Sequence, residues 1–236
     1  MLTTLGRELT CLASAVVHLP RAIGHGAPVV LELPPPVPPA VPIGTPVLLL
    51  HGYLGTGTAW GPLVRRLHTA GFVHVFALRY DSLSAGVPEL AEALTDAVRT
   101  TMARTGHTGV HLVGHSLGGL VVRYAVQRLG LDRVTRSVVT IGTPHRGSRL
   151  ARLGVGPAVA QLRPGSVLLR QLPPLTQTGQ VRWAVIYASA DVVARAVAGE
   201  TSLRGYGHHS VLEAPELADA VVEHLRGAEP PVLLAA

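Results

Sequence analysis

The 236-residue sequence contains no lysine, no asparagine and a single cysteine. One cysteine cannot form an intrachain disulfide, and Cys11 lies outside any C-x-x-C pattern, so the sequence implies neither an oxidising compartment nor a cysteine-built metal site. Aromatic residues are also few, with two Trp, five Tyr and two Phe, which argues against the stacking platforms that bind single-stranded nucleic acid. The 47% apolar content is enough for one well-covered core and one domain of catalytic size.

All 20 basic residues are arginine, and with 14 acidic residues they give a net charge of +6. The arginines are spread along the chain, and they accompany heavy use of Ala, Gly, Pro and Val, as a GC-rich coding bias would produce. This distribution argues against a nucleic-acid partner, because such proteins gather their basic residues in one patch. The positive charge still permits attraction to anionic membrane surfaces or acidic substrates. No feature points to an obligate protein partner.

The first 45 residues are expected to form an N-terminal helix followed by a Pro-rich linker at 33–46. Apolar residues at steps of three and four predict one helix face over residues 2–19, packed on the main domain. A membrane-surface helix and a signal peptide stay open as alternatives, although no clean cleavage site follows. No stretch reaches the roughly 20 apolar residues that span a bilayer. We expect a cytoplasmic or peripherally membrane-associated protein, with secretion possible.

Strand and helix patterns alternate from residue 46 onward. Buried strands are predicted at 46–52, 73–80, 109–114, 137–144 and 181–189, and helices at 86–106, 117–130 and 214–227. This alternation predicts an α/β fold with a mainly parallel central sheet and helices on both faces. We expect one catalytic domain at 46–227, without a large cap domain, and a tail at 228–236.

Ser116 lies where a predicted buried strand passes directly into a helix, within the string "GHSLG". In that context a G-x-S-x-G string predicts a nucleophile elbow. Glycine is needed at Gly114 and Gly118, because a side chain at either position would collide with the nearby backbone in so tight a turn. The serine hydroxyl is then exposed above the sheet at the amino end of a helix, where developing negative charge is favoured.

A serine hydroxyl needs a base, and the base needs an orienting acid. On a nucleophile-elbow fold the acid follows the serine and the histidine comes last. Asp191 directly follows a strand at the carboxyl edge of the sheet and is the predicted acid, with Glu200 as the reserve, whereas Asp132 is expected at the opposite edge. His224 falls within the predicted last helix, where a surface role is expected, so the predicted base lies in the glycine-flanked loop at 205–212, whose spacing alone leaves His208 and His209 open.

Five blocks together resemble the signature blocks of bacterial lipases and esterases of the α/β-hydrolase family, in the same order: "VLLLHGYLG", "VGHSLGGL", "VVTIGTPHRGS", "YASADVV" and "GYGHHSVL". The resemblance covers about residues 46–226. It implies that His208 is the catalytic histidine, since the block 205–208 matches the family's histidine-containing loop. It also implies an oxyanion hole made by the backbone amides of Tyr53 and Leu117, two donors of the kind that acyl transfer requires.

Three further histidines are candidate substrate-binding residues: His51, His115 and His145. His51 is expected to shape the loop under the oxyanion hole, and His115 to pack against the elbow. His145 either lines the pocket or stabilises its loop. Although the chain has 12 histidines, no H-E-x-x-H or comparable cluster appears, so we assign no metal and no cofactor.

The sequence therefore predicts a carboxylic ester hydrolase that acts through a serine acyl-enzyme on acylglycerols or other lipid-like esters. The apolar segments 150–162 and 165–175 would wall an acyl pocket or form a short lid, although a core-packing helix would have the same composition. Two other functions stay open. One is an acyltransferase or thioesterase that uses the same triad, and the other is a non-catalytic protein of this fold that binds an ester-like ligand.

Overall fold

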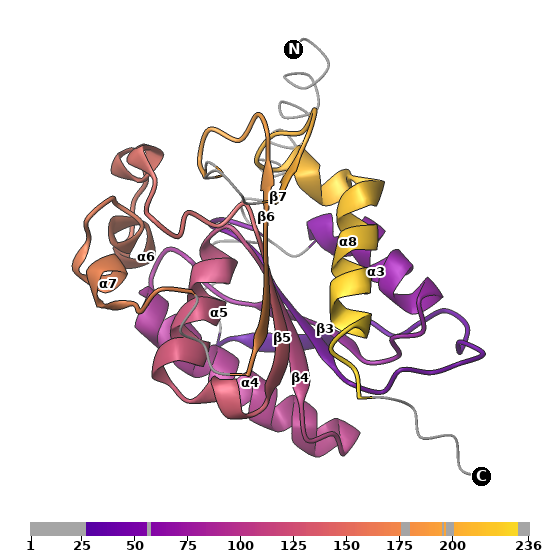
Figure 1. Ribbon diagram of the computed structural model, residues 1–236. Coiled ribbons are helices and arrows are strands. Elements are labelled where there is room, and N and C mark those ends of the chain that lie inside the picture. The colour runs from indigo at the N-terminus through magenta and orange to yellow at the C-terminus, as the bar shows by residue number, and fades with distance from the viewer. Residues whose placement is uncertain (1–26, 56–57, 176–179, 195, 197–200, 231–236) are drawn as a thin grey trace.

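The computed structural model describes residues 27–55, 58–175, 180–194, 196 and 201–230, and the helix predicted at 2–19 lies outside them. Its centre is a seven-stranded sheet of order β1-β3-β2-β4-β5-β6-β7 (Figure 1). The strands are β1 (Val29–Glu32), β2 (Val47–Leu50), β3 (Val75–Arg79), β4 (Val110–His115), β5 (Thr135–Ile141), β6 (Arg182–Ala188) and β7 (Thr201–Leu203). Only β1 pairs in the antiparallel direction. The predicted mainly parallel α/β fold is confirmed.

Helices cover both faces of this sheet (Figure 1). The six α-helices in the described part of the chain are α3 (Gly61–Thr69), α4 (Val87–Thr105), α5 (Leu117–Arg128), α6 (Pro157–Gln161), α7 (Val167–Gln171) and α8 (Pro215–Arg226). α4 and α5 pack on one face, whereas α3 and α8 pack on the other. No helix within the described residues is long and apolar enough to cross a membrane.

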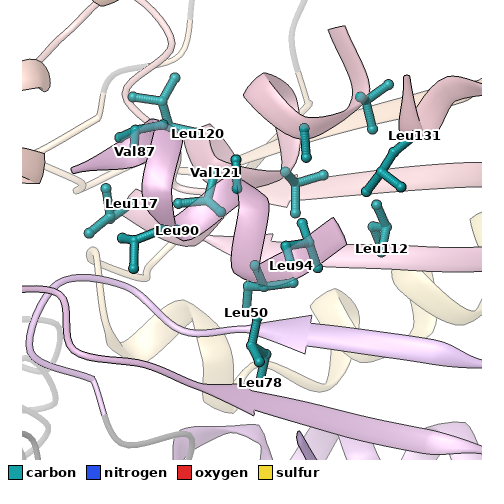
Figure 2. Close-up of a cluster of buried hydrophobic side chains, with 14 of the residues drawn as sticks. Leu50, Leu78, Val87, Leu90, Leu94, Leu112, Leu117, Leu120, Val121 and Leu131 are labelled. Carbon is teal, nitrogen blue, oxygen red and sulfur yellow. The ribbon is translucent and has the colours of Figure 1, made fainter. Parts of the chain in front are cut away.

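The core consists of two apolar layers, one on each side of the sheet. Alternate residues of β2 point to opposite layers, so Leu48 and Leu50 contact the α4 and α5 side while Val47 and Leu49 contact the α3 and α8 side. Figure 2 shows Leu50 in the first layer, close to Leu94 of α4. A strand that is buried on both faces must be apolar at every position, which explains the continuous apolar runs in the sequence.

The sequence patterns do not predict β1, α3 or β7. β1 lies before residue 46, where the catalytic domain was expected to start, and Leu33 continues its pairing by donating a backbone hydrogen bond to Val75. β1 is an edge strand with three of its four residues exposed, so it has no buried run to recognise. β7 is a three-residue edge strand. α3 begins with Gly61 and Pro62, which resemble a turn in the sequence although proline is acceptable in a first helical turn.

A row of polar side chains lies at the amino end of β4, on the opposite edge from Ser116. The ring of His111 hydrogen-bonds to Ser137 Oγ through Nδ1 at 2.8 Å and to Glu229 Oε1 through Nε2 at 2.5 Å. Thr45 Oγ1 donates to the other carboxylate oxygen of Glu229 at 2.8 Å. Partial burial raises the pKa of Glu229, but these hydrogen bonds outweigh it and hold the pKa below its ordinary value. These hydrogen bonds hold Glu229, the second residue of the tail predicted at 228–236, against the amino edge of the sheet.

Candidate active site

Ser116 occupies a strained turn between β4 and α5. Its φ of 53° and ψ of −119° lie in a region that non-glycine residues rarely adopt. A Cβ on Gly114 would lie 2.5 Å from the backbone of Gly119, and a Cβ on Gly118 would lie 2.4 Å from the carbonyl oxygen of Leu50. Glycine is therefore required at both positions, as the sequence pattern predicts for a nucleophile elbow.

His208 and Asp191 complete a hydrogen-bonded row with this serine. His208 Nε2 lies 2.9 Å from Ser116 Oγ, and His208 Nδ1 lies 2.8 Å from Asp191 Oδ2. Because a carboxylate only accepts, the imidazole proton lies on Nδ1, which leaves the Nε2 lone pair to accept from the serine hydroxyl. Asp191 Oδ1 accepts two backbone hydrogen bonds, from Val193 at 2.7 Å and from Ala194 at 2.9 Å. All three side chains are buried, so their geometry is fixed before any ligand arrives.

The loops that carry the acid and the base meet at the carboxyl edge of the sheet. Asp191 follows β6 and His208 follows β7, and Ala190 donates a backbone hydrogen bond to Tyr206 to join the two loops. Gly142, the residue directly after β5, lies close to both loops and has a φ of +53°. A Cβ there would lie 3.0 Å from Asp191 Oδ2 and 3.3 Å from His208 Nδ1. Sequence reasoning missed Gly142, although a glycine directly after a buried strand at this edge was a usable signal.

The other candidates for acid and base are not in this row. Asp132 lies in the 3₁₀ turn Leu131–Arg133 just before β5, at the amino edge of the sheet. Glu200 lies outside the described residues. His224 lies in α8, where its Nε2 hydrogen-bonds to the backbone carbonyl of Arg182 at 3.2 Å. His209 is next to His208 and lines the cavity described below.

The two amides predicted to form the oxyanion hole come from the helix start after the serine and from the loop after β2. Leu117 is the first residue of α5, so its N–H has no intrahelical acceptor. Tyr53 follows Gly52, and a Cβ on Gly52 would lie 2.9 Å from Ser116 Cβ, which shows how closely this loop approaches the elbow. No acceptor for either amide is found among the described residues.

His51 and His145 are held by hydrogen bonds to other residues and are not among the residues that line the cavity. His51 Nδ1 donates to the carbonyl of Gly52 at 2.8 Å, and its ring stacks on Tyr80 at 4.1 Å. His145 Nε2 lies 3.0 Å from Thr140 Oγ1. Burial lowers the pKa of His51 to about 4 and that of His145 to about 3, so both rings are neutral near pH 7.

His115 contacts the base directly. Its Nε2–H donates to the backbone carbonyl of His208 at 2.9 Å, and the two rings lie 4.8 Å apart. Burial, followed by the nearby rings of His208 and His209, holds the pKa of His115 well below its ordinary value. A neutral His115 thus supports the loop of His208, and it also forms part of the cavity wall.

A cavity of about 190 Å³ opens in front of Ser116. Its apolar wall comes mainly from the segment 150–162, which the sequence predicted as a pocket wall or lid, or alternatively as a core helix. The lining residues are Gly52, Tyr53, His115, Ser116, Ser148, Leu150, Ala151, Gly154, Val159, Leu162, Val193, His208 and His209. Val159 and Leu162 also belong to the core, so this segment serves both purposes. Tyr53 OH donates to the carbonyl of Val155 at 2.9 Å, which ties the segment to the loop beside the elbow.

No group of three or more His, Cys, Asp or Glu side chains that could hold a metal ion occurs within the described ranges. The row of serine, histidine and aspartate, the two amides and the cavity can together perform nucleophilic acyl chemistry.

A family model described as palmitoyl protein thioesterase matches residues 46–189, more than half of the chain. The chain belongs to this family. The matched region includes the elbow, the Tyr53 loop and the cavity segment, whereas Asp191 and His208 follow it. The family assignment therefore agrees with the hydrolase resemblance of the sequence blocks.

Curated relatives of this palmitoyl protein thioesterase family member include triacylglycerol lipases. The chain is 38% identical over 113 residues to one from Pseudarthrobacter phenanthrenivorans, across 45% of this chain and 35% of the relative. It is 33% identical over 112 residues to one from Vibrio cholerae, across 46% of this chain and 35% of the relative. The chain thus spans about a third of the length of the curated relatives that it matches.

Solved structures confirm the α/β-hydrolase fold. A Bacillus licheniformis lipase superimposes with a TM-score of 0.66 at 18% identity, over 84% of this chain and 97% of the lipase chain. A monoacylglycerol lipase from Paleococcus ferrophilus gives a TM-score of 0.62 at 18% identity, over 86% of this chain and 99% of that chain.

Proposed function

We propose that the protein hydrolyses carboxylic esters of lipid-like substrates through a serine acyl-enzyme. The observation that carries this proposal is the hydrogen-bonded row of Ser116, His208 and Asp191, which faces a cavity with an apolar wall. A nucleophile, a base and an orienting acid in this order are what acyl transfer to serine requires. The triacylglycerol lipase relatives support a substrate of this class.

In the first half of the reaction, Ser116 Oγ attacks the ester carbonyl and His208 Nε2 takes the hydroxyl proton. Asp191 stabilises the imidazolium that forms, because its carboxylate already accepts from Nδ1. The amides of Tyr53 and Leu117 donate to the negative oxygen of the tetrahedral intermediate. The C–O bond to the alcohol then breaks, and His208 returns its proton to the leaving oxygen.

In the second half, water attacks the acyl-enzyme. His208 Nε2 takes a proton from the water, a second tetrahedral intermediate forms, and it collapses with release of the carboxylic acid. The proton returns to Ser116 Oγ, so the protein is unchanged over one cycle. The two amides stabilise the second intermediate as they do the first.

The apolar cavity wall favours an acyl chain as the part of the substrate that enters the protein. Leu150, Ala151, Val159, Leu162 and Val193 offer only apolar side chains to a ligand. Burying each methylene of an acyl chain against such a wall contributes about 0.8 kcal/mol. Affinity should therefore increase with chain length until the cavity is filled.

A thioesterase is the second candidate, and the match to the palmitoyl protein thioesterase model is the observation that favours it. The same residues would act in the same order. The difference lies in the leaving group, which would be a thiol that departs by C–S cleavage and needs less protonation by His208 than an alkoxide.

Labelling with an active-site serine phosphonate, followed by a substrate panel, tests the proposal. The wild-type protein should be labelled at Ser116, and Ser116→Ala should remain folded but lose both the label and at least about 10⁴-fold in turnover. The panel compares p-nitrophenyl esters of increasing chain length with palmitoyl-coenzyme A. Faster turnover of esters supports the hydrolase, faster turnover of the thioester supports the second candidate, and wild-type turnover by the alanine variant would refute both.

A further inference from the structure

The chain segment beside the cavity carries basic residues and no acidic ones. Between Asp132 and Asp191 the sequence contains eight arginines and no Asp or Glu. Five of these arginines lie in the segment 146–170 that follows β5 and carries α6 and α7, and all five are exposed: Arg146, Arg149, Arg152, Arg163 and Arg170. In Figure 1 α6 and α7 project from one side of the sheet, away from α3 and α8.

These arginines have no carboxylate partner among the described residues. Arg163 and Arg170 donate to backbone carbonyls of their own segment. Three arginines elsewhere do pair with carboxylates: Arg66 with Asp219 at 2.6 Å, Arg99 with Asp96 at 3.0 Å and Arg104 with Glu32 at 2.6 Å. The segment 146–170 therefore presents cationic groups that the described part of the chain does not neutralise.

Large apolar side chains are exposed between these arginines. Leu153 is 84% exposed, Val155 is 67% exposed and Val167 is 60% exposed. Leu150 is 43% exposed and also lines the cavity, so the apolar surface continues from the outside into the site. Arg149 and Arg152 flank Leu150 in the 3₁₀ turn Arg149–Arg152.

We propose that the exposed residues of 146–170, here called the arginine rim, dock the protein on an anionic phospholipid surface. This inference rests on the proposed function, because it explains how a lipid-like ester would reach Ser116. Arginines attract the phosphate groups of such a surface, and each basic residue near it contributes about fivefold in affinity, corresponding to ~1 kcal/mol. Leu153 and Val155 enter the boundary between headgroups and acyl chains, where an exposed apolar side chain loses its contact with water. Tyr53 OH holds the Val155 backbone, so the docked rim stays attached to the loop beside the elbow.

Vesicle co-sedimentation tests this proposal. The full-length Ser116→Ala protein is mixed with vesicles of phosphatidylcholine alone, or of phosphatidylcholine and phosphatidylglycerol in equal parts. It should bind the anionic vesicles at least about tenfold more tightly, and added salt should weaken that binding because salt screens exposed charges. Equal binding to both vesicles, or binding that salt leaves unchanged, would overturn the proposal.

Matched variants separate the rim from the overall charge. Arg149→Gln with Arg152→Gln should weaken binding to anionic vesicles by at least about tenfold, since two fivefold contributions are lost. Arg65→Gln with Arg133→Gln removes the same charge from exposed positions on α3 and at the amino edge, and should weaken binding by less than about threefold. If the two pairs weaken binding equally, the rim is not the docking surface.

A second pair tests the apolar contribution. Leu153→Ser should reduce vesicle binding severalfold, whereas Val41→Ser, at a position that is 77% exposed, should leave it unchanged. The competing partner is an acidic protein, for which polyglutamate is the probe. If polyglutamate binds and the anionic vesicles do not, the rim docks an acidic protein and the proposal of a lipid surface is refuted. Every vesicle-binding measurement uses a protein that carries Ser116→Ala and therefore does not depend on catalysis. If the wild-type protein fails to hydrolyse esters, the proposed function is refuted, but the vesicle-binding result still stands.

Discussion

Replacing His208 or His209 with alanine distinguishes a catalytic histidine from its neighbour. The two residues are adjacent in sequence, and their rings lie 5.0 Å apart. Only His208 hydrogen-bonds to both Ser116 and Asp191. His209 lines the cavity, so its loss changes the shape of the site and leaves the hydrogen-bonded row in place.

The expected magnitudes follow from what each substitution removes. His208→Ala removes the proton acceptor for Ser116, and loss of such a group costs on the order of 10⁴ to 10⁶ in kcat, which corresponds to about 5 to 8 kcal/mol in activation free energy. His209→Ala should cost about tenfold or less, or roughly 1.4 kcal/mol. The double variant Ser116→Ala with His208→Ala should be no slower than either single variant, because the groups act as a unit.

Steady-state hydrolysis of one water-soluble short-chain ester measures all of these variants under the same conditions. Urea unfolding of each purified variant checks that the fold is intact. An active His208→Ala protein together with an inactive His209→Ala protein would reverse the assignment. It would also show that His209, and not His208, matches the catalytic histidine in the family's loop.

Tyr53→Phe removes the hydroxyl that holds the segment 150–162 and should raise KM for a long-chain ester several-fold with little change in kcat, and an unchanged KM would contradict that role. Burial holds the pKa of His51 at about 4 and that of His145 at about 3, and it also lowers the pKa of His115, so below pH 6.5 these rings take up protons in the unfolded chain that they do not bind in the folded protein. His51 and His145 should each cost roughly 2 kcal/mol of stability between pH 7 and pH 5, measured by urea unfolding, and His145→Gln should reduce the total loss by about 2 kcal/mol. Glu229→Gln should lower the free energy of unfolding by about 1 to 3 kcal/mol, because it weakens a charge-assisted bond to buried His111, and an unchanged unfolding midpoint would refute this.

Sequence reasoning succeeded where a local pattern determines the structure. The helix predicted at 86–106 is α4 at 87–105, because glycines at both ends mark its limits and its buried positions recur at helical spacing. The strand, Ser116 turn and α5 were predictable for the same reason, since the glycines around the serine have no alternative in so tight a turn. These features depend on a few neighbouring residues.

The rest depends on contacts between distant segments. The side chains of His51 and His145 were candidates for substrate binding, but His51 bonds to Gly52 and Tyr80 and His145 bonds to Thr140 of β5, and no sequence pattern shows where a ring will turn. Gly142 supports the acid and the base only because β5 ends beneath both loops. The choice between His208 and His209 depended on the family resemblance, and the hydrogen bonds around His208 provide an independent geometric argument for the same choice.

The row at the amino end of β4 is a second hydrogen-bonded serine, histidine and carboxylate in the same molecule. Ser137 and His111 are fully buried, and the imidazole is reversed, with Nδ1 toward the serine and Nε2 toward Glu229. Ser137 lies within strand β5 beside a register shift against β4, and unlike Ser116 it has no positive φ and does not precede a helix. A geometric search for three hydrogen-bonded side chains would therefore find this protein twice. Comparing the two rows within one protein shows that the hydrogen bonds alone do not define the candidate nucleophile. Ser116 differs from Ser137 in its tight turn and in the cavity in front of it.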